Sequence, residues 1–123
     1  VSEMKLRSVG LSLAGISFGL GLVELAMAKR TARWLGVPSA SKWITAFGVR
    51  ELVAGAALFK NPTASHNAWG RVAGDVIDLA ALAAAARVPG SHKRAIVGAA
   101  AFVGVALIAD AAAAFAMRRA EKR

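Results

Sequence analysis

The chain has 123 residues, of which 57% are hydrophobic, and its formal net charge at pH 7 is +9. This length fits one domain, and the hydrophobic share lies above that of ordinary soluble domains. The absence of cysteine excludes disulfides, thiolate metal sites and a catalytic thiol. The basic residues gather at the ends of apolar segments rather than alternating with stacking aromatic residues, so we expect no nucleic-acid partner.

Four apolar segments predict an all-α protein, an integral membrane antiparallel four-helix bundle in which residues 1–123 form one domain. A helix of about 20 apolar residues crosses the hydrocarbon core of a bilayer. Short connections favour an up-down-up-down order. A soluble bundle would need polar faces at helical spacing, which the fourth segment lacks. The predicted spans are residues 8–28, 43–59, 69–86 and 95–117.

The first predicted span carries one charge, Glu24. It resembles a cleavable signal peptide, but Glu24 lies close to the cleavage-like sequence and three more apolar segments follow, so we expect a retained helix. Small residues spaced four apart let helix backbones approach closely in lipid, and the alternative explanation is that glycine is simply common in membrane helices. These pairs are Gly10 with Ala14, Gly15 with Gly19, and Ser17 with Gly21.

A basic connection, residues 29–42, leads to the second span. Trp34 among basic residues is typical of a segment at the membrane interface. Pro38 should end any helix, and Ser39 or Ser41 should cap the next one.

The second and third spans carry charged residues in their middle, and the fourth carries one about two-thirds of the way along. The three charges of the third span are spaced i, i+4 and i+7, which places them on one face of a helix. His66 and His92 fall in the connections and are interpreted as interfacial residues rather than ligands. The charged residues are Arg50 and Glu51 in the second span, Arg71, Asp75 and Asp78 in the third, and Asp110 in the fourth.

Charged groups inside a bilayer are costly, and they usually face a bundle interior or a wet cavity with a function. We therefore predict that all seven groups converge inside the bundle as a ligand-binding or ion-pair cluster. Five acids against two arginines leave a formal excess of three negative charges if all ionise. The cluster residues are Glu24, Arg50, Glu51, Arg71, Asp75, Asp78 and Asp110.

Several functions fit such a cluster. Our main hypothesis is a polar intramembrane pocket for a lipid-like or small charged ligand. The alternatives are a proton- or cation-coupled transporter or channel, a membrane-embedded acid/base enzyme of cyclase or isomerase type, and a purely structural ion-pair network. No ligand spacing indicates a metal, and no nucleotide or catalytic-triad motif is present, so no cofactor is expected.

Four strings resemble an uncharacterised bacterial membrane region that precedes a soluble START-like domain in proteins related to polyketide cyclases and dehydrases. They are residues 18–26 (FGLGLVELA), 47–51 (FGVRE), 69–79 (WGRVAGDVIDL) and 109–110 (AD). The resemblance implies a four-helix membrane unit, a cytoplasmic C-terminus and a START-like partner domain. It implies no established activity.

The expected location is the inner cell membrane, with both termini cytoplasmic and the protein self-associating as a homo-oligomer. Four spans place the two termini and the 60–67 connection on one side. Seven lysine and arginine residues flank the spans on each side, so the positive-inside rule does not choose an orientation. Such a tie is compatible with dual insertion as an antiparallel pair.

Overall fold

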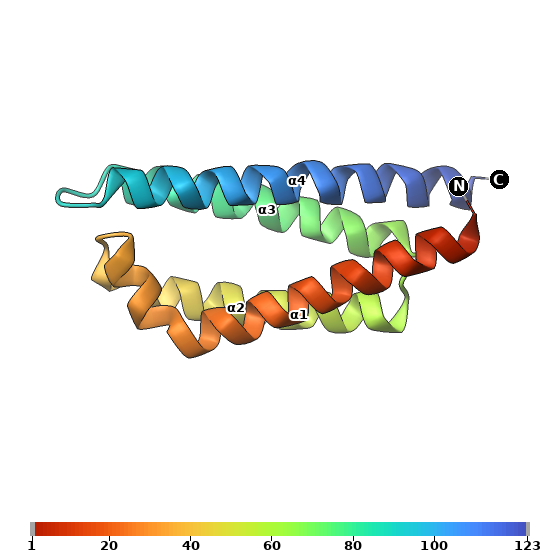
Figure 1. The fold of residues 1–123 in the computed structure, drawn as a ribbon, viewed down its shortest axis with the longest axis horizontal. Helices are drawn as coiled ribbons and strands as arrows, with labels where there is room; N and C mark the ends of the chain where they lie inside the picture. The colour runs from red at the N-terminus through yellow and green to blue at the C-terminus, as the bar shows by residue number, and fades with distance from the viewer. Residues whose placement is uncertain (1, 123) are drawn as a thin grey trace.

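The computed structural model of the protein describes residues 2–122, and this part of the chain contains four α-helices and one short 3₁₀ helix (Figure 1). Each predicted apolar segment lies inside one α-helix, so the all-α prediction with four helices is confirmed. The elements are α1 (Glu3–Trp34), η1 (Pro38–Ala40), α2 (Ser41–Lys60), α3 (Ser65–Ala86) and α4 (Lys93–Glu121).

The first helix continues beyond its predicted span. Residues 29–34, which were predicted to be a connection, extend α1 as far as Trp34. Lysine, arginine and alanine favour helix, so the polar sequence marks the end of an apolar segment without ending the helix. The helix changes direction at Met27, whose φ of −119° and ψ of 21° are not helical.

The predicted serine cap of the second helix is wrong. The residue that precedes α2 is Ala40, and no side chain caps the helix. Pro38 begins η1, and its carbonyl oxygen accepts a hydrogen bond from the backbone N–H of Ser41. Because η1 runs directly into α2, this backbone bond takes the place that a serine side chain would otherwise fill.

The helices pack as two antiparallel hairpins, α1 with α2 and α3 with α4 (Figure 1). Glycines allow α1 and α2 to approach closely: a Cβ atom on Gly21 would lie 2.8 Å from the backbone oxygen of Gly48. Ser17 and Gly21 therefore pack as their spacing predicts. Gly15 and Gly19 make no such contact within the chain, since a Cβ atom on either would meet nothing within 4 Å.

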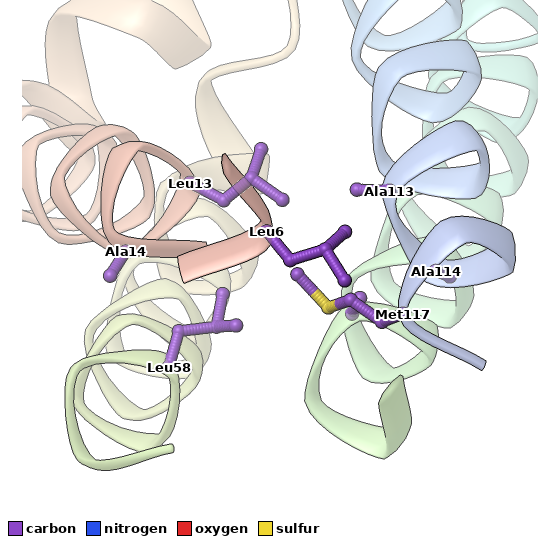
Figure 2. Packing of buried hydrophobic residues seen from close by; sticks show 8 residues of the cluster. Leu6, Leu13, Ala14, Leu58, Ala113, Ala114 and Met117 are labelled. Atoms are coloured by element: carbon purple, nitrogen blue, oxygen red, sulfur yellow. The ribbon is translucent and has the colours of Figure 1, made fainter. Parts of the chain in front are cut away.

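Two apolar clusters join the hairpins on either side of the helix midpoints. At one end Leu6 reaches from α1 toward Met117 of α4, with Leu58 of α2 beside them (Figure 2). At the other end the cluster contains Ala32 and Ile96. Along each helix the charged residues lie between these clusters, so the fold places them in the middle of the molecule.

Backbone contacts also link the hairpins near the loops. The N–H of His92 donates to the carbonyl oxygen of Leu35 at 2.8 Å, and its Nδ1 lies 2.8 Å from the Trp34 oxygen. Gly36, with φ of +77°, leaves no room for a side chain here, since a Cβ atom would lie 2.6 Å from the His92 nitrogen. His66 lies in the first turn of α3 rather than in a connection.

At the opposite end, the last residue of α4 closes the start of α3. Glu121 accepts hydrogen bonds from the Ser65 hydroxyl at 2.5 Å and from the Ser65 N–H at 2.8 Å. These two bonds lower the pKa of Glu121, and the bond from the hydroxyl has the larger effect. Glu121 lies beyond the predicted span. The carboxylate thus supplies the cap that Ala64, which precedes α3, lacks.

Two helices, α1 and α4, are long and apolar enough to cross a membrane. Their most apolar stretches have mean hydropathies of 1.8 and 2.1, yet only 28% and 11% of those stretches are buried. The core helix of a soluble protein would be mostly buried, so these helices present apolar side chains outward. Helices α2 and α3 are not apolar enough to count as candidate membrane spans, because each carries charged residues in its middle.

Candidate functional site

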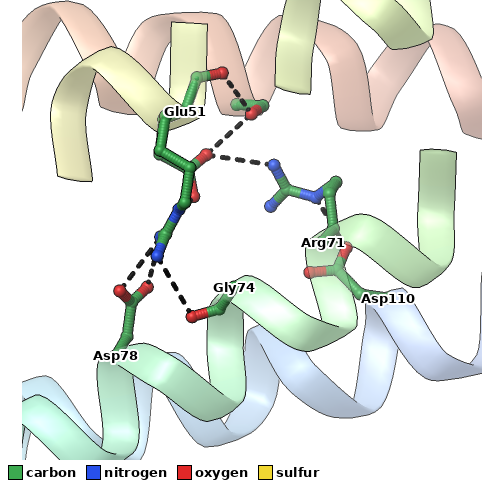
Figure 3. A network of polar contacts seen from close by, with 7 residues as sticks. Glu51, Arg71, Gly74, Asp78 and Asp110 are labelled. Carbon is green, nitrogen blue, oxygen red and sulfur yellow. Dashed lines mark hydrogen bonds and ion pairs between the residues drawn. The ribbon is translucent and has the colours of Figure 1, made fainter. Parts of the chain in front are cut away.

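A chain of hydrogen bonds and ion pairs connects all four helices near their midpoints (Figure 3). We call it the polar network. It consists of Ser17 on α1, Arg50 and Glu51 on α2, Arg71, Gly74 and Asp78 on α3, and Asp110 on α4.

Arg71 is the centre of the buried part of the network. Its Nε donates to Asp110 Oδ1 at 3.0 Å and its Nη1 donates to Glu51 Oε2 at 3.1 Å. The side chain is 3% exposed, and that of Asp110 is 1% exposed. One guanidinium group therefore ties α3 to α2 and to α4 away from the surrounding medium.

Arg50 forms a second, more open part. Its Nη2 donates to both Asp78 oxygens, at 2.9 and 3.0 Å, and lies 3.5 Å from Glu51 Oε1. Its Nη1 donates to the Gly74 backbone oxygen at 3.4 Å. A Cβ atom on Gly74 would lie 3.2 Å from the guanidinium carbon, so glycine lets the arginine rest against α3.

Ser17 brings the first helix into the network and was not among the predicted site residues. Its hydroxyl lies 2.7 Å from Glu51 Oε2 and 2.8 Å from the Glu51 backbone oxygen. The residue is fully buried. Its position on the small-residue face with Gly21 could have identified it, because a hydroxyl there must face the neighbouring helix.

Asp75 is buried, being 4% exposed, and within residues 2–122 its Oδ2 has no hydrogen-bond partner. The same holds for Oδ2 of Asp110. Buried polar atoms without partners are rare in folded proteins, so this pair is the unsatisfied point of the site.

Glu24 lies at the edge of the network. A Cβ atom on Gly48 would meet the Glu24 side chain at 3.1 Å, which places Glu24 against α2. The charges of Arg50, Glu51 and Asp78 act on its carboxylate. Among the described residues it forms no ion pair and no side-chain hydrogen bond, so it lies outside the bonds of the polar network.

The predicted cluster is therefore brought together in one region. Arg50, Glu51, Arg71, Asp78 and Asp110 are bonded to one another, and Asp75 and Glu24 lie beside them. Between residues 2 and 122 no three histidine, aspartate or glutamate residues are grouped as metal ligands would be. The arrangement can hold charge in an apolar setting, and its excess of acids favours a positively charged guest.

Comparison of the chain with protein-family models, curated proteins and solved structures finds no match. The family resemblance of the four sequence strings thus stays a prediction, and the function has to be argued from the site.

Proposed function

We propose that the protein is an integral membrane protein whose four helices cross the bilayer, and that the polar network with Glu24 and Asp75 forms an intramembrane site that binds and passes a proton or small cation. In this proposal both termini face the cytoplasm. The observation that carries the proposal is the buried pair of unpartnered carboxylate oxygens on Asp75 and Asp110.

The distribution of polarity supports membrane insertion. Val49 and Val53 on α2, and Val76 and Ile77 on α3, are each at least half exposed. The charged residues in the middle of the same helices point toward one another instead. An apolar exterior around a charged interior suits lipid, whereas monomeric soluble proteins rarely expose large apolar surfaces.

The charge balance supports a cationic guest. Five acids and two arginines occupy the site, which is a formal excess of three negative charges. Arg50 and Arg71 are already bonded to Glu51, Asp78 and Asp110. A proton or small cation beside Asp75 would reduce the excess and satisfy an oxygen that the protein leaves without a partner.

A purely structural network is the second candidate, because both arginines are bonded to carboxylates from other helices. A measurement of ion flux distinguishes the transport site from the structural network. The protein is reconstituted in liposomes loaded with a pH-sensitive or sodium-sensitive dye, and a potassium diffusion potential drives uptake. We expect uptake by the unmodified protein and its loss in Asp75→Asn, which removes the ionisable group and keeps the side-chain shape.

The matched control is Glu3→Gln, which neutralises an exposed acid in the first turn of α1. It should transport normally. The unmodified protein, Asp75→Asn and Glu3→Gln should melt at similar temperatures. Normal flux through Asp75→Asn would refute the proposed role of Asp75. A stable unmodified protein that passes neither ion would leave the structural network as the better description.

A further inference from the structure

A hollow lies on the surface where α1 bends and α2 begins. The bend is at Met27, and the hollow has a volume of about 760 Å³. Residues 25–30 of α1 form one wall, and Ser41, Lys42 and Thr45 of α2 form the other. We call it the basic groove. It shares no residue with the polar network.

The lining of the basic groove combines cationic and apolar side chains. Lys29, Arg30 and Lys42 are exposed, and no acid is among the lining residues. Within residues 2–122 none of these three cations takes part in an ion pair. Leu25 and Met27 supply apolar surface on the same α1 wall as Lys29 and Arg30. The groove thus offers uncompensated positive charge beside a hydrocarbon surface.

The position of the groove fits the level of lipid headgroups. The predicted spans end at residue 28 on α1 and begin at residue 43 on α2, on either side of the hollow. Trp43 and Trp34 are 68% and 55% exposed at the same end of the molecule. Exposed tryptophan next to lysine and arginine is typical of the membrane interface.

We propose that the basic groove binds the phosphate of an anionic phospholipid, with the cations around the phosphate and an acyl chain against Leu25 and Met27. Lysine and arginine side chains close to a membrane surface attract anionic lipid headgroups. The inference rests on the membrane insertion proposed above but not on proton or cation passage. Free inorganic phosphate carries the same charged group, and the apolar side chains of Leu25 and Met27 favour the lipid over it.

The test uses purified protein in a neutral detergent, titrated with phosphatidylglycerol, phosphatidylcholine or inorganic phosphate and followed by tryptophan fluorescence. The variant Lys29→Gln/Arg30→Gln/Lys42→Gln removes the three cations. Its matched control, Arg118→Gln/Arg119→Gln/Lys122→Gln, removes three cations at the other end of the molecule. We expect tighter binding of phosphatidylglycerol than of phosphatidylcholine, an affinity loss on the order of 100-fold in the groove variant, and little change in the control.

Equal losses in the two variants would show that net charge alone attracts the lipid, and would overturn the site. Equal binding of phosphatidylcholine and phosphatidylglycerol, or inorganic phosphate binding as tightly as the lipid, would overturn the lipid assignment. Incorporation into liposomes separates this inference from the proposed function. A protein that inserts but whose groove variant binds lipid normally contradicts the basic groove alone, whereas a protein that does not insert contradicts both.

Discussion

Arg71 is the residue on which the buried half of the network depends. Its guanidinium group supplies the cation bonded to Glu51 on one side and Asp110 on the other. In a low-dielectric interior such pairs add little net stability compared with apolar residues, but removing one partner strands the other. Arg71 therefore matters through the acids that its loss would leave behind.

We expect Arg71→Ala to lower the free energy of unfolding by about 3–5 kcal/mol, because Glu51 and Asp110 would remain buried without their cation. The measurement is equilibrium unfolding of the protein in detergent mixtures. A second variant, Arg71→Ala/Asp110→Asn, should recover part of the loss, since one stranded charge is removed with its partner.

The comparison protein for this prediction is Arg119→Ala, which removes an exposed arginine near the end of α4 and should change stability by less than about 0.5 kcal/mol. If Arg71→Ala unfolds at the same point as Arg119→Ala, the two ion pairs contribute nothing to the fold and the structural interpretation of the network is wrong.

The sequence predicted which charged residues would meet, but not how they pair. Spacing alone puts Arg71, Asp75 and Asp78 on one face of α3. The structure then directs Arg71 to α2 and α4 and directs Asp78 to Arg50. These choices depend on how each helix is rotated and how far apart the hairpins lie, which periodicity does not specify.

At the scale of elements, glycine determines how closely α1 and α2 approach. Gly21 faces the backbone oxygen of Gly48, and Gly55 faces the backbone of Ala14 and Phe18. Close approach also brings Ser17 within reach of Glu51. The small-residue face of α1 thus supports both the hairpin and the network.

Gly21→Ala should separate α1 from α2, because its Cβ atom would lie 2.8 Å from the backbone oxygen of Gly48, which cannot move aside as a side chain would. We expect a loss of about 1–3 kcal/mol in unfolding free energy. Gly15→Ala is the control on the same helix, since its Cβ atom would meet nothing within 4 Å. It should be neutral or slightly stabilising. Equal effects of the two substitutions would contradict the close packing of this hairpin.

Hydropathy predicted that the four helices form, but it did not predict where they begin and end. Hydropathy locates the part of a helix that suits hydrocarbon, and the backbone continues as helix wherever the next residues permit it. This is why α1 extends through the basic residues 29–34 and why α3 begins at Ser65, ahead of the predicted span. The capping of Ser65 by Glu121 was equally inaccessible, because it joins residues 56 positions apart.

At the scale of the whole molecule, the two hairpins expose more surface than their size requires. The accessible area is 7479 Å², whereas a compact soluble chain of this mass exposes roughly 6,200 Å². Large apolar side chains are exposed on all four helices, among them Ile16, Val53, Ile77 and Ile108. This elongated form, with the start of α1 and the end of α4 at one end (Figure 1), suits a four-span topology.

That topology predicts opposite accessibility for the two ends of the hairpins. The chain has no cysteine, so single substitutions give a labelling experiment without background. Asn61 lies in the loop between α2 and α3, and Ser39 lies in η1 between α1 and α2; both are exposed. With both termini cytoplasmic, an impermeant maleimide should label Ser39→Cys in intact spheroplasts and should label Asn61→Cys only after permeabilisation.

The labelling pattern also decides what the tie in flanking charges means. Half-labelling of both variants in intact cells would indicate dual insertion, because seven lysine and arginine residues flank the spans on each side and give neither orientation an advantage. Labelling restricted to Asn61→Cys would reverse the orientation while keeping α2 as a membrane-crossing helix. Complete labelling of both variants from the same side would rule out a membrane-crossing α2, and with it the placement of Arg50 and Glu51 inside the bilayer.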